Sequence, residues 1–170
     1  MLDLLRPDMM AEAIWEIPLD ELRGRGIEGL IVDLDNTIVD WNRNRVRQEV
    51  QRWLQKASGM GMRVCIASNA RSKARVSAIA DEVGALWLAP AGKPSRRGLR
   101  QAMAMLGVTP DAAALVGDQL FTDVMGGNRL GLFTILVRPL SGRDFPATRI
   151  MRILEWFVLR RLRGSVKEAG

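Results

Sequence analysis

Residues 29–37 read Gly29-Leu30-Ile31-Val32-Asp33-Leu34-Asp35-Asn36-Thr37. The apolar first half predicts a strand that is buried on both faces, as strands of parallel sheets are. Because side chains alternate along a strand, Asp33 and Asp35 leave its end on the same side. Open parallel sheets place their ligand sites at the carboxyl ends of their strands. Two carboxylates there can hold a cation or attack an electrophile, and the plainer alternative is a solvated turn.

Short apolar segments alternate with amphipathic helical segments along the rest of the chain. The expected strands are residues 29–33, 63–67, 85–88, 113–117 and 133–137. Apolar residues at helical spacing lie between them, in residues 46–57, 76–83 and 99–106. This alternation implies right-handed crossovers and a three-layer, Rossmann-like α/β fold with a five-stranded, mainly parallel sheet.

The residue types that are missing narrow the possible chemistry. The chain has no histidine, which excludes Ser-His-Asp and Cys-His nucleophile systems, histidine-ligated zinc and imidazole acid–base catalysis. Catalysis must then rest on carboxylates, lysine, hydroxyls and a hard cation, and oxygen ligands favour Mg²⁺. The single cysteine, Cys65, lies in an apolar strand and is expected to be an inert core residue in a reducing compartment.

Length and charge indicate one domain followed by a basic tail. The 170 residues fit one domain with a real core, which we expect at residues 1–145, with a tail at 146–170. No signal-peptide pattern opens the chain, and no apolar run approaches the roughly 18 residues of a spanning helix, so a cytoplasmic protein is expected. The net charge is +6, and residues 138–170, with eight basic and three acidic residues, carry +5 of it.

Polar residues follow the other predicted strands as well. Ser68 and Asn69 end the second strand, where a helix expected to begin near Ala70 would aim its free amides at an anion. Lys93 follows the third strand, immediately before a proline expected in the first turn of the next helix. Asp118 ends the fourth strand, and Asp123 follows five residues later. In a parallel sheet these strand ends share one edge, so the pattern indicates metal-assisted phosphoryl transfer.

Four segments resemble, in order, the motifs of the haloacid dehalogenase (HAD) superfamily of phosphohydrolases. They are Asp33-Leu34-Asp35-Asn36-Thr37, Ser68-Asn69, Lys93-Pro94 and Gly117-Asp118-Gln119-Leu120-Phe121-Thr122-Asp123. More narrowly, Gly126-Gly127-Asn128-Arg129 and the segment 134–137 resemble the YqeG-type phosphatases of subclass IIIA. That similarity spans roughly residues 5–160 and extends to mitochondrial phosphatidylglycerophosphate phosphatases.

The resemblance implies a role for each site residue. Asp33 would be the nucleophile that forms an aspartyl-phosphate, and Asp35 would protonate the leaving oxygen and then activate water. Magnesium would be held by the carboxylates of Asp33 and Asp118 and by the backbone carbonyl of Asp35.

The remaining motif residues would assist those three. Ser68, the backbone of Asn69, and Lys93 would bind the phosphoryl oxygens. Asp123 would support the metal or orient Lys93, and Thr37 would brace the first loop by hydrogen bonding.

Two intervals in the chain bear on the choice of substrate. Residues 35–68 and 68–93 each hold one helix and one strand, which leaves no room for a cap domain. An open site suits a phosphate group that is attached to a large molecule or surface. The leading hypothesis for the substrate is therefore phosphatidylglycerophosphate at an anionic membrane. A soluble nucleotide or sugar phosphate is the second enzyme hypothesis.

Residues 147–163 read as a basic amphipathic helix, which fits a membrane interface or packing on the domain or on another subunit of a homo-oligomer. An RNA- or ribosome-binding protein with little turnover is a third possibility. Nucleic acid is disfavoured because the chain has few aromatic residues and no tyrosine for stacking.

Overall fold

The computed structural model describes residues 2–41 and 43–141, which form one parallel sheet with helices on both faces. The strands are β1 (Met9–Ala11), β2 (Gly29–Val32), β3 (Arg63–Ala67), β4 (Leu86–Leu88), β5 (Ala113–Gly117) and β6 (Phe133–Val137). The helices are α1 (Leu19–Gly24), α2 (Gln48–Gly59), α3 (Lys73–Val83), α4 (Arg96–Leu106) and α5 (Met125–Asn128). A π-helical turn, η4 (Leu120–Val124), joins β5 to α5.

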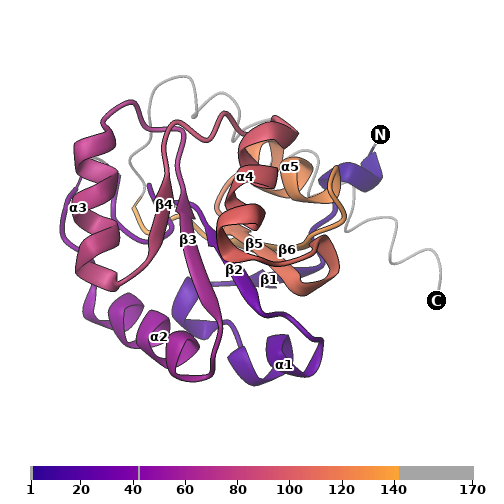
Figure 1. The fold of residues 1–170 in the computed structure, drawn as a ribbon, viewed down its shortest axis with the longest axis horizontal. Helices are drawn as coiled ribbons and strands as arrows, with labels where there is room; N and C mark the ends of the chain where they lie inside the picture. The colour runs from indigo at the N-terminus through magenta and orange to yellow at the C-terminus, as the bar shows by residue number, and fades with distance from the viewer. Residues whose placement is uncertain (1, 42, 142–170) are drawn as a thin grey trace.

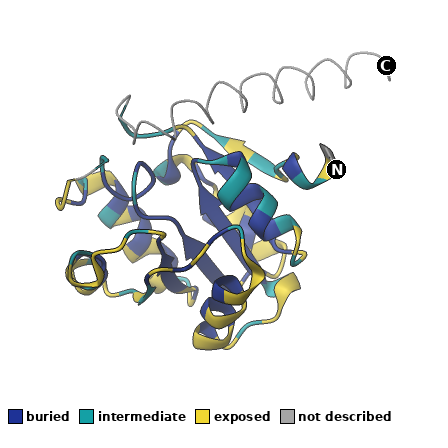
Figure 2. Cartoon of the chain, turned by 90° about the horizontal axis from the view of Figure 1, so that it is seen from above, coloured by how far each residue is buried: buried dark blue, intermediate teal, exposed yellow. Residues whose placement is uncertain are grey.

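The three layers follow from the alternation of buried side chains along the strands. Leu30 and Val32 of β2 face the cluster formed with α1, α2 and α3, whereas Ile31 faces the cluster formed with α4. Figure 1 shows these helices on the two sides of the sheet, and Figure 2 shows the buried strands between helices with exposed outer faces. The predicted Rossmann-like α/β architecture is confirmed.

The prediction of five strands is wrong, because the sheet has six in the order β1-β6-β5-β2-β3-β4. The additional strand, β1, is three residues long and pairs in parallel with the edge of β6, where Met9 lies opposite Ile135. The carboxylate of Asp8, just before β1, accepts a 2.7 Å hydrogen bond from the backbone N–H of Thr134. A strand of three residues is too short for the alternation of apolar and polar side chains to be recognised in the sequence.

The helices that follow β3 and β4 begin later than expected. Ser72 caps α3 by accepting a hydrogen bond from the N–H of Arg75, so Ser68 and Asn69 lie in a separate loop before the helix. Ser95 caps α4, which leaves Pro94 outside that helix. No cap domain interrupts either interval among the described residues, as predicted.

The tail predicted at residues 146–170, including the helix expected at 147–163, lies outside the described residues. Among the helices of the described part, none combines the length and the apolar character that crossing a bilayer requires.

Candidate active site

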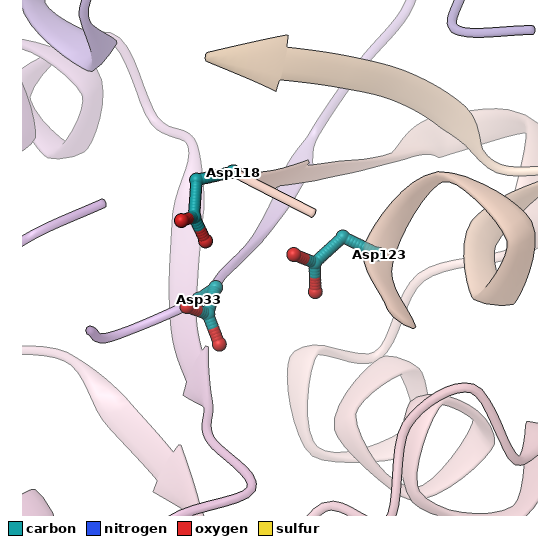
Figure 3. Close-up of side chains that lie close together, drawn as sticks. All are labelled: Asp33, Asp118 and Asp123. Atoms are coloured by element: carbon teal, nitrogen blue, oxygen red, sulfur yellow. The ribbon is translucent and has the colours of Figure 1, made fainter. Parts of the chain in front are cut away.

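The register of the sheet brings Asp33 and Asp118 together. Strands β2 and β5 are parallel neighbours with Val32 opposite Val116, so the residues that follow each strand emerge at the same level. The N–H of Asp33 donates to the carbonyl of Val116 at 2.8 Å, so the hydrogen-bonded pairing of β2 with β5 continues to Asp33. Figure 3 shows the three side chains close together, with the carboxylates of Asp118 and Asp123 turned toward Asp33.

A glycine lets Asp123 approach the other two carboxylates. A Cβ atom on Gly117 would overlap the carboxyl group of Asp123, so only glycine fits at the end of β5. The backbone N–H of Gln119 donates to Asp123 Oδ2 at 3.2 Å and orients this carboxylate. One carboxylate oxygen each from Asp33, Asp118 and Asp123 lies within 4.8 Å of the others, and all three residues are buried.

Lys93 balances part of the negative charge of this cluster. Its Nζ donates to Asp33 Oδ1 at 2.6 Å and to Asp123 Oδ1 at 2.7 Å, and only 1% of its side chain is exposed. A buried ammonium is tolerated when it is paired in this way, because the carboxylates replace its lost hydration. Three buried carboxylates therefore share one buried cation.

The same arrangement shifts both partners' pKa values. Burial raises the pKa of Asp33 to about 8, with further increases from Asp123 and Asp118 and an opposing decrease from Lys93. Burial alone would lower the pKa of Lys93, but the negative charges of Asp123 and Asp33 more than offset this and raise it above its ordinary value. Lys93 thus stays charged, while Asp33 resists ionisation until more positive charge reaches the cluster.

The cluster fits a divalent cation on chemical grounds. Its donors are carboxylate oxygens, the ligands that Mg²⁺ prefers, and its uncompensated negative charge is buried where water screens it little. Asp33 and Asp118 were both expected to hold the metal. Asp123 lies with them, but both of its oxygens already accept hydrogen bonds, from Lys93 and Gln119.

Asn69 joins the loop after β3 to the loop that carries Lys93. Its side-chain amide donates to the carbonyl of Lys93 at 2.9 Å, and its Oδ1 accepts from the N–H of Lys93 at 2.9 Å. The carbonyl of Ser68 accepts a further bond from the N–H of Ala91. The phosphate-binding role expected of the Asn69 backbone stays a prediction, and the Asn69 side chain holds Lys93 in place.

Asp35 lies apart from the cluster and pairs with a residue that the motifs did not include. Arg75, in the first turn of α3, donates to both carboxylate oxygens of Asp35 at 2.7 and 3.1 Å. Arg75 is itself held by the carbonyl of Arg43 and the side chain of Asn44. An arginine in the first turn of a helix is electrostatically unfavourable, but the sequence did not reveal this placement, because the helix was expected to begin near Ala70.

A cavity of about 470 Å³ opens over these groups. Its walls include Asp33, Asp35, Asn36, Trp41, Ser68, Asn69, Ala70, Arg71, Lys93, Gln119 and Thr122. Thr37 is fully buried, and its backbone N–H donates to the carbonyl of Leu34 at 3.4 Å, whereas its hydroxyl has no hydrogen-bond partner within the described residues.

The chain belongs to the haloacid dehalogenase-like hydrolase family, whose model matches residues 3–131. Within that family it is a phosphatase. It is 34% identical to the "Probable phosphatase YqeG" of Bacillus subtilis, over 96% of this chain and 92% of that protein.

More distant relatives have a named lipid substrate. Phosphatidylglycerophosphate phosphatase 1 of Chlamydomonas reinhardtii is 30% identical over 92% of this chain, and that of Arabidopsis thaliana is 27% identical over 90%. The chain spans 62% and 46% of the lengths of these two proteins. Among solved structures, the cobalt-bound deoxy-D-mannose-octulosonate 8-phosphate phosphatase of Haemophilus influenzae shares the fold, with a TM-score of 0.54 and 17% identity, over 66% of this chain and 69% of that one.

Proposed function

We propose that this protein is a magnesium-dependent phosphomonoester hydrolase that forms an aspartyl-phosphate on Asp33 and acts on phosphatidylglycerophosphate. The observation that carries the proposal is the carboxylate of Asp33 in a cavity wall, clustered with Asp118 and bound by Lys93. Two relatives that bear this substrate's name support the choice of lipid. A site without a cap domain in the described residues also suits a phosphate anchored at a surface.

The reaction proceeds in two displacements at phosphorus. A carboxylate oxygen of Asp33 bonds to phosphorus as the bond to the glycerol oxygen breaks. Asp35, protonated after one of its oxygens leaves Arg75, gives the glycerol oxygen a proton. Water then attacks the phosphorus, Asp35 accepts a proton from it, and the carboxylate of Asp33 is released with inorganic phosphate. Asp33, Asp118 and the backbone carbonyl of Asp35 would hold magnesium, which would supply the positive charge that lets an anionic nucleophile approach an anionic phosphate.

The neighbouring groups stabilise the phosphoryl oxygens during both steps. Lys93 offers a buried positive charge, and Ser68 and the backbone of Asn69 offer hydrogen bonds at the same edge of the sheet. Asp123 holds Lys93 in position through its 2.7 Å contact, and Thr37 lies buried beneath the first loop.

Hydrolysis in mixed micelles tests the proposed substrate. Detergent disperses the lipid, so turnover does not depend on how the protein binds a membrane. We expect kcat/KM for phosphatidylglycerophosphate to exceed that for nucleotide and sugar phosphates by at least about tenfold, a difference of roughly 1.4 kcal/mol in transition-state binding. Equal or faster turnover of the soluble esters would favour the second enzyme hypothesis.

Magnesium should raise the melting temperature, because it binds the folded cluster and has no equivalent site in the unfolded chain. At about 100 times the dissociation constant the gain is about 2.7 kcal/mol, or roughly 5–10 °C for a chain of this size. Differential scanning fluorimetry in MgCl₂, compared with EDTA at matched ionic strength, measures the shift. Asp118→Asn should remove most of it, whereas Asp20→Asn, on the surface, should leave it unchanged.

The magnesium-induced shift should also increase from pH 6 to pH 8. The pKa of Asp33 is raised to about 8 without metal, so the folded protein holds a proton that an unfolded aspartate releases near pH 4. Metal-free stability should therefore fall as pH rises over this interval. Magnesium must displace that proton below pH 8, which weakens its binding there. A shift that stays constant with pH would contradict this account.

A further inference from the structure

Exposed basic residues gather at the edge of the sheet where the cavity opens. Up to residue 137 the chain is almost balanced, with 17 basic and 16 acidic residues. Six exposed bases nevertheless lie in the segments that follow β2, β3 and β4, and we call them the cationic collar: Arg43, Arg45, Arg71, Lys73, Arg96 and Arg97. None of the six side chains forms an ion pair with any residue in the described ranges.

The cationic collar flanks the mouth of the cavity on the side of β2, β3 and β4, because these strands are parallel neighbours. Their carboxyl ends share one edge, which lies at the top of Figure 1 for β3 and β4. Arg71 lines the cavity itself, and Arg96 and Arg97 begin the helix after the Lys93 loop. Some exposed charges away from this edge are matched, as in the pairs Glu28–Arg63 and Asp20–Lys56.

Helix stability does not account for the position of these bases. Lys73 is the first residue of α3, and Arg96 and Arg97 are the first two of α4, where the helix dipole disfavours positive charge. In contrast, α1 and α2 have acidic residues in their first turns. Three bases at unfavourable positions around one opening indicate a role in binding an anionic partner.

We propose that the cationic collar docks the protein on an anionic lipid membrane, with the cavity mouth facing the headgroups. This inference rests on the proposed function, because a lipid-borne phosphate must enter the cavity from the membrane side. Each Lys or Arg near an anionic leaflet strengthens binding by about fivefold, so several bases spread around an opening suit an extended surface better than a small metabolite. Single-stranded nucleic acid would in addition need stacking aromatics, and Trp41 is the one aromatic residue among the described cavity walls.

Vesicle binding by the full chain tests the docking surface. The collar variant combines Lys73→Glu, Arg96→Glu and Arg97→Glu, which place acids at helix N-termini, where the dipole favours them. Arg71 is left unchanged because it lines the cavity. The control combines Arg23→Glu, Arg52→Glu and Lys56→Glu on α1 and α2, which gives the same net charge at exposed positions of the other helices. Thermal unfolding verifies that both variants fold.

Co-sedimentation is measured with phosphatidylcholine vesicles, with and without phosphatidylglycerol. We expect the unaltered protein to prefer the anionic vesicles, the collar variant to lose about a hundredfold in partitioning, and the control to lose less than about tenfold. Equal losses in the two variants, or no loss in either, would overturn the proposal. So would tighter binding to an RNA homopolymer than to the vesicles at equal ionic strength.

The binding assay and the micelle assay can fail separately. The vesicles contain no phosphomonoester lipid, so binding through the collar is detectable even if phosphatidylglycerophosphate is not the substrate. Conversely, hydrolysis in micelles can proceed although the collar plays no part in docking. Residues 142–170 are retained in every variant, so whatever they contribute is the same throughout.

Discussion

Asp33→Asn should lower kcat by at least about a thousandfold while the protein stays folded. The amide has the shape of the carboxylate but cannot attack phosphorus, so the covalent step is lost. The free energy of unfolding should change by less than about 1 kcal/mol, because the substitution removes a buried charge that burial already disfavours and Lys93 keeps its contact with Asp123. Steady-state phosphate release and urea denaturation measure the two effects.

The matched control for this experiment is Asp20→Asn. Asp20 is exposed, and its only ion pair among the described residues is a 3.7 Å contact with Lys56, so neither activity nor stability should change. If Asp33→Asn kept more than about a tenth of the activity, another group would have to be the nucleophile. If it unfolded, its lost activity would say nothing about chemistry.

Gly98→Ala should destabilise the protein by about 1–3 kcal/mol and reduce activity, although alanine is the better helix former. A Cβ atom at Gly98 would overlap the backbone carbonyl of Ala91. That carbonyl belongs to the loop that carries Lys93, and the N–H of Ala91 is bonded to Ser68. The clash therefore has to move α4 or displace the loops that carry Lys93 and Ser68, and melting temperature together with kcat/KM would record it.

Gly59→Ala provides the comparison with the opposite expected sign. Gly59 is also helical, at the end of α2, but a Cβ atom there would meet nothing within 4 Å. We expect this variant to be unchanged or more stable by about 0.4–1 kcal/mol, because alanine restricts the unfolded chain. Similar effects of the two substitutions would show that the close contact at Gly98 is not the cause.

The sequence predicted the strands of this sheet wherever an apolar run ended in a polar residue. Asp33, Lys93, Asp118 and Asp123 meet at one edge, as parallel strands require, because strand order and register follow from buried residues such as Val32 and Val116. Their catalytic roles stay predictions. Strand β1 was not predicted because its pairing depends on a long-range contact between Asp8 and Thr134.

The hydrogen-bond partners of the side chains were harder to predict than the positions of those residues in the fold. The pairing of Asp35 with Arg75 joins residues forty positions apart and depends on where α3 begins. The start of α3 was predicted too early, because Ser68 and Ser72 are both suitable N-cap residues. Only the packing of the loop between them determines which serine caps the helix. The buried hydroxyl of Thr37 without a described partner has no explanation in the contacts of this structure.

The paired hydrogen bonds between Asn69 and Lys93 couple two loops that are separated in sequence by a helix and a strand. Because two hydrogen bonds join them, a displacement of either loop is transmitted to the other. A single hydrogen bond would act as a hinge, whereas two antiparallel ones resist rotation. The ammonium group at the tip of Lys93 is therefore positioned by a residue that it does not itself touch.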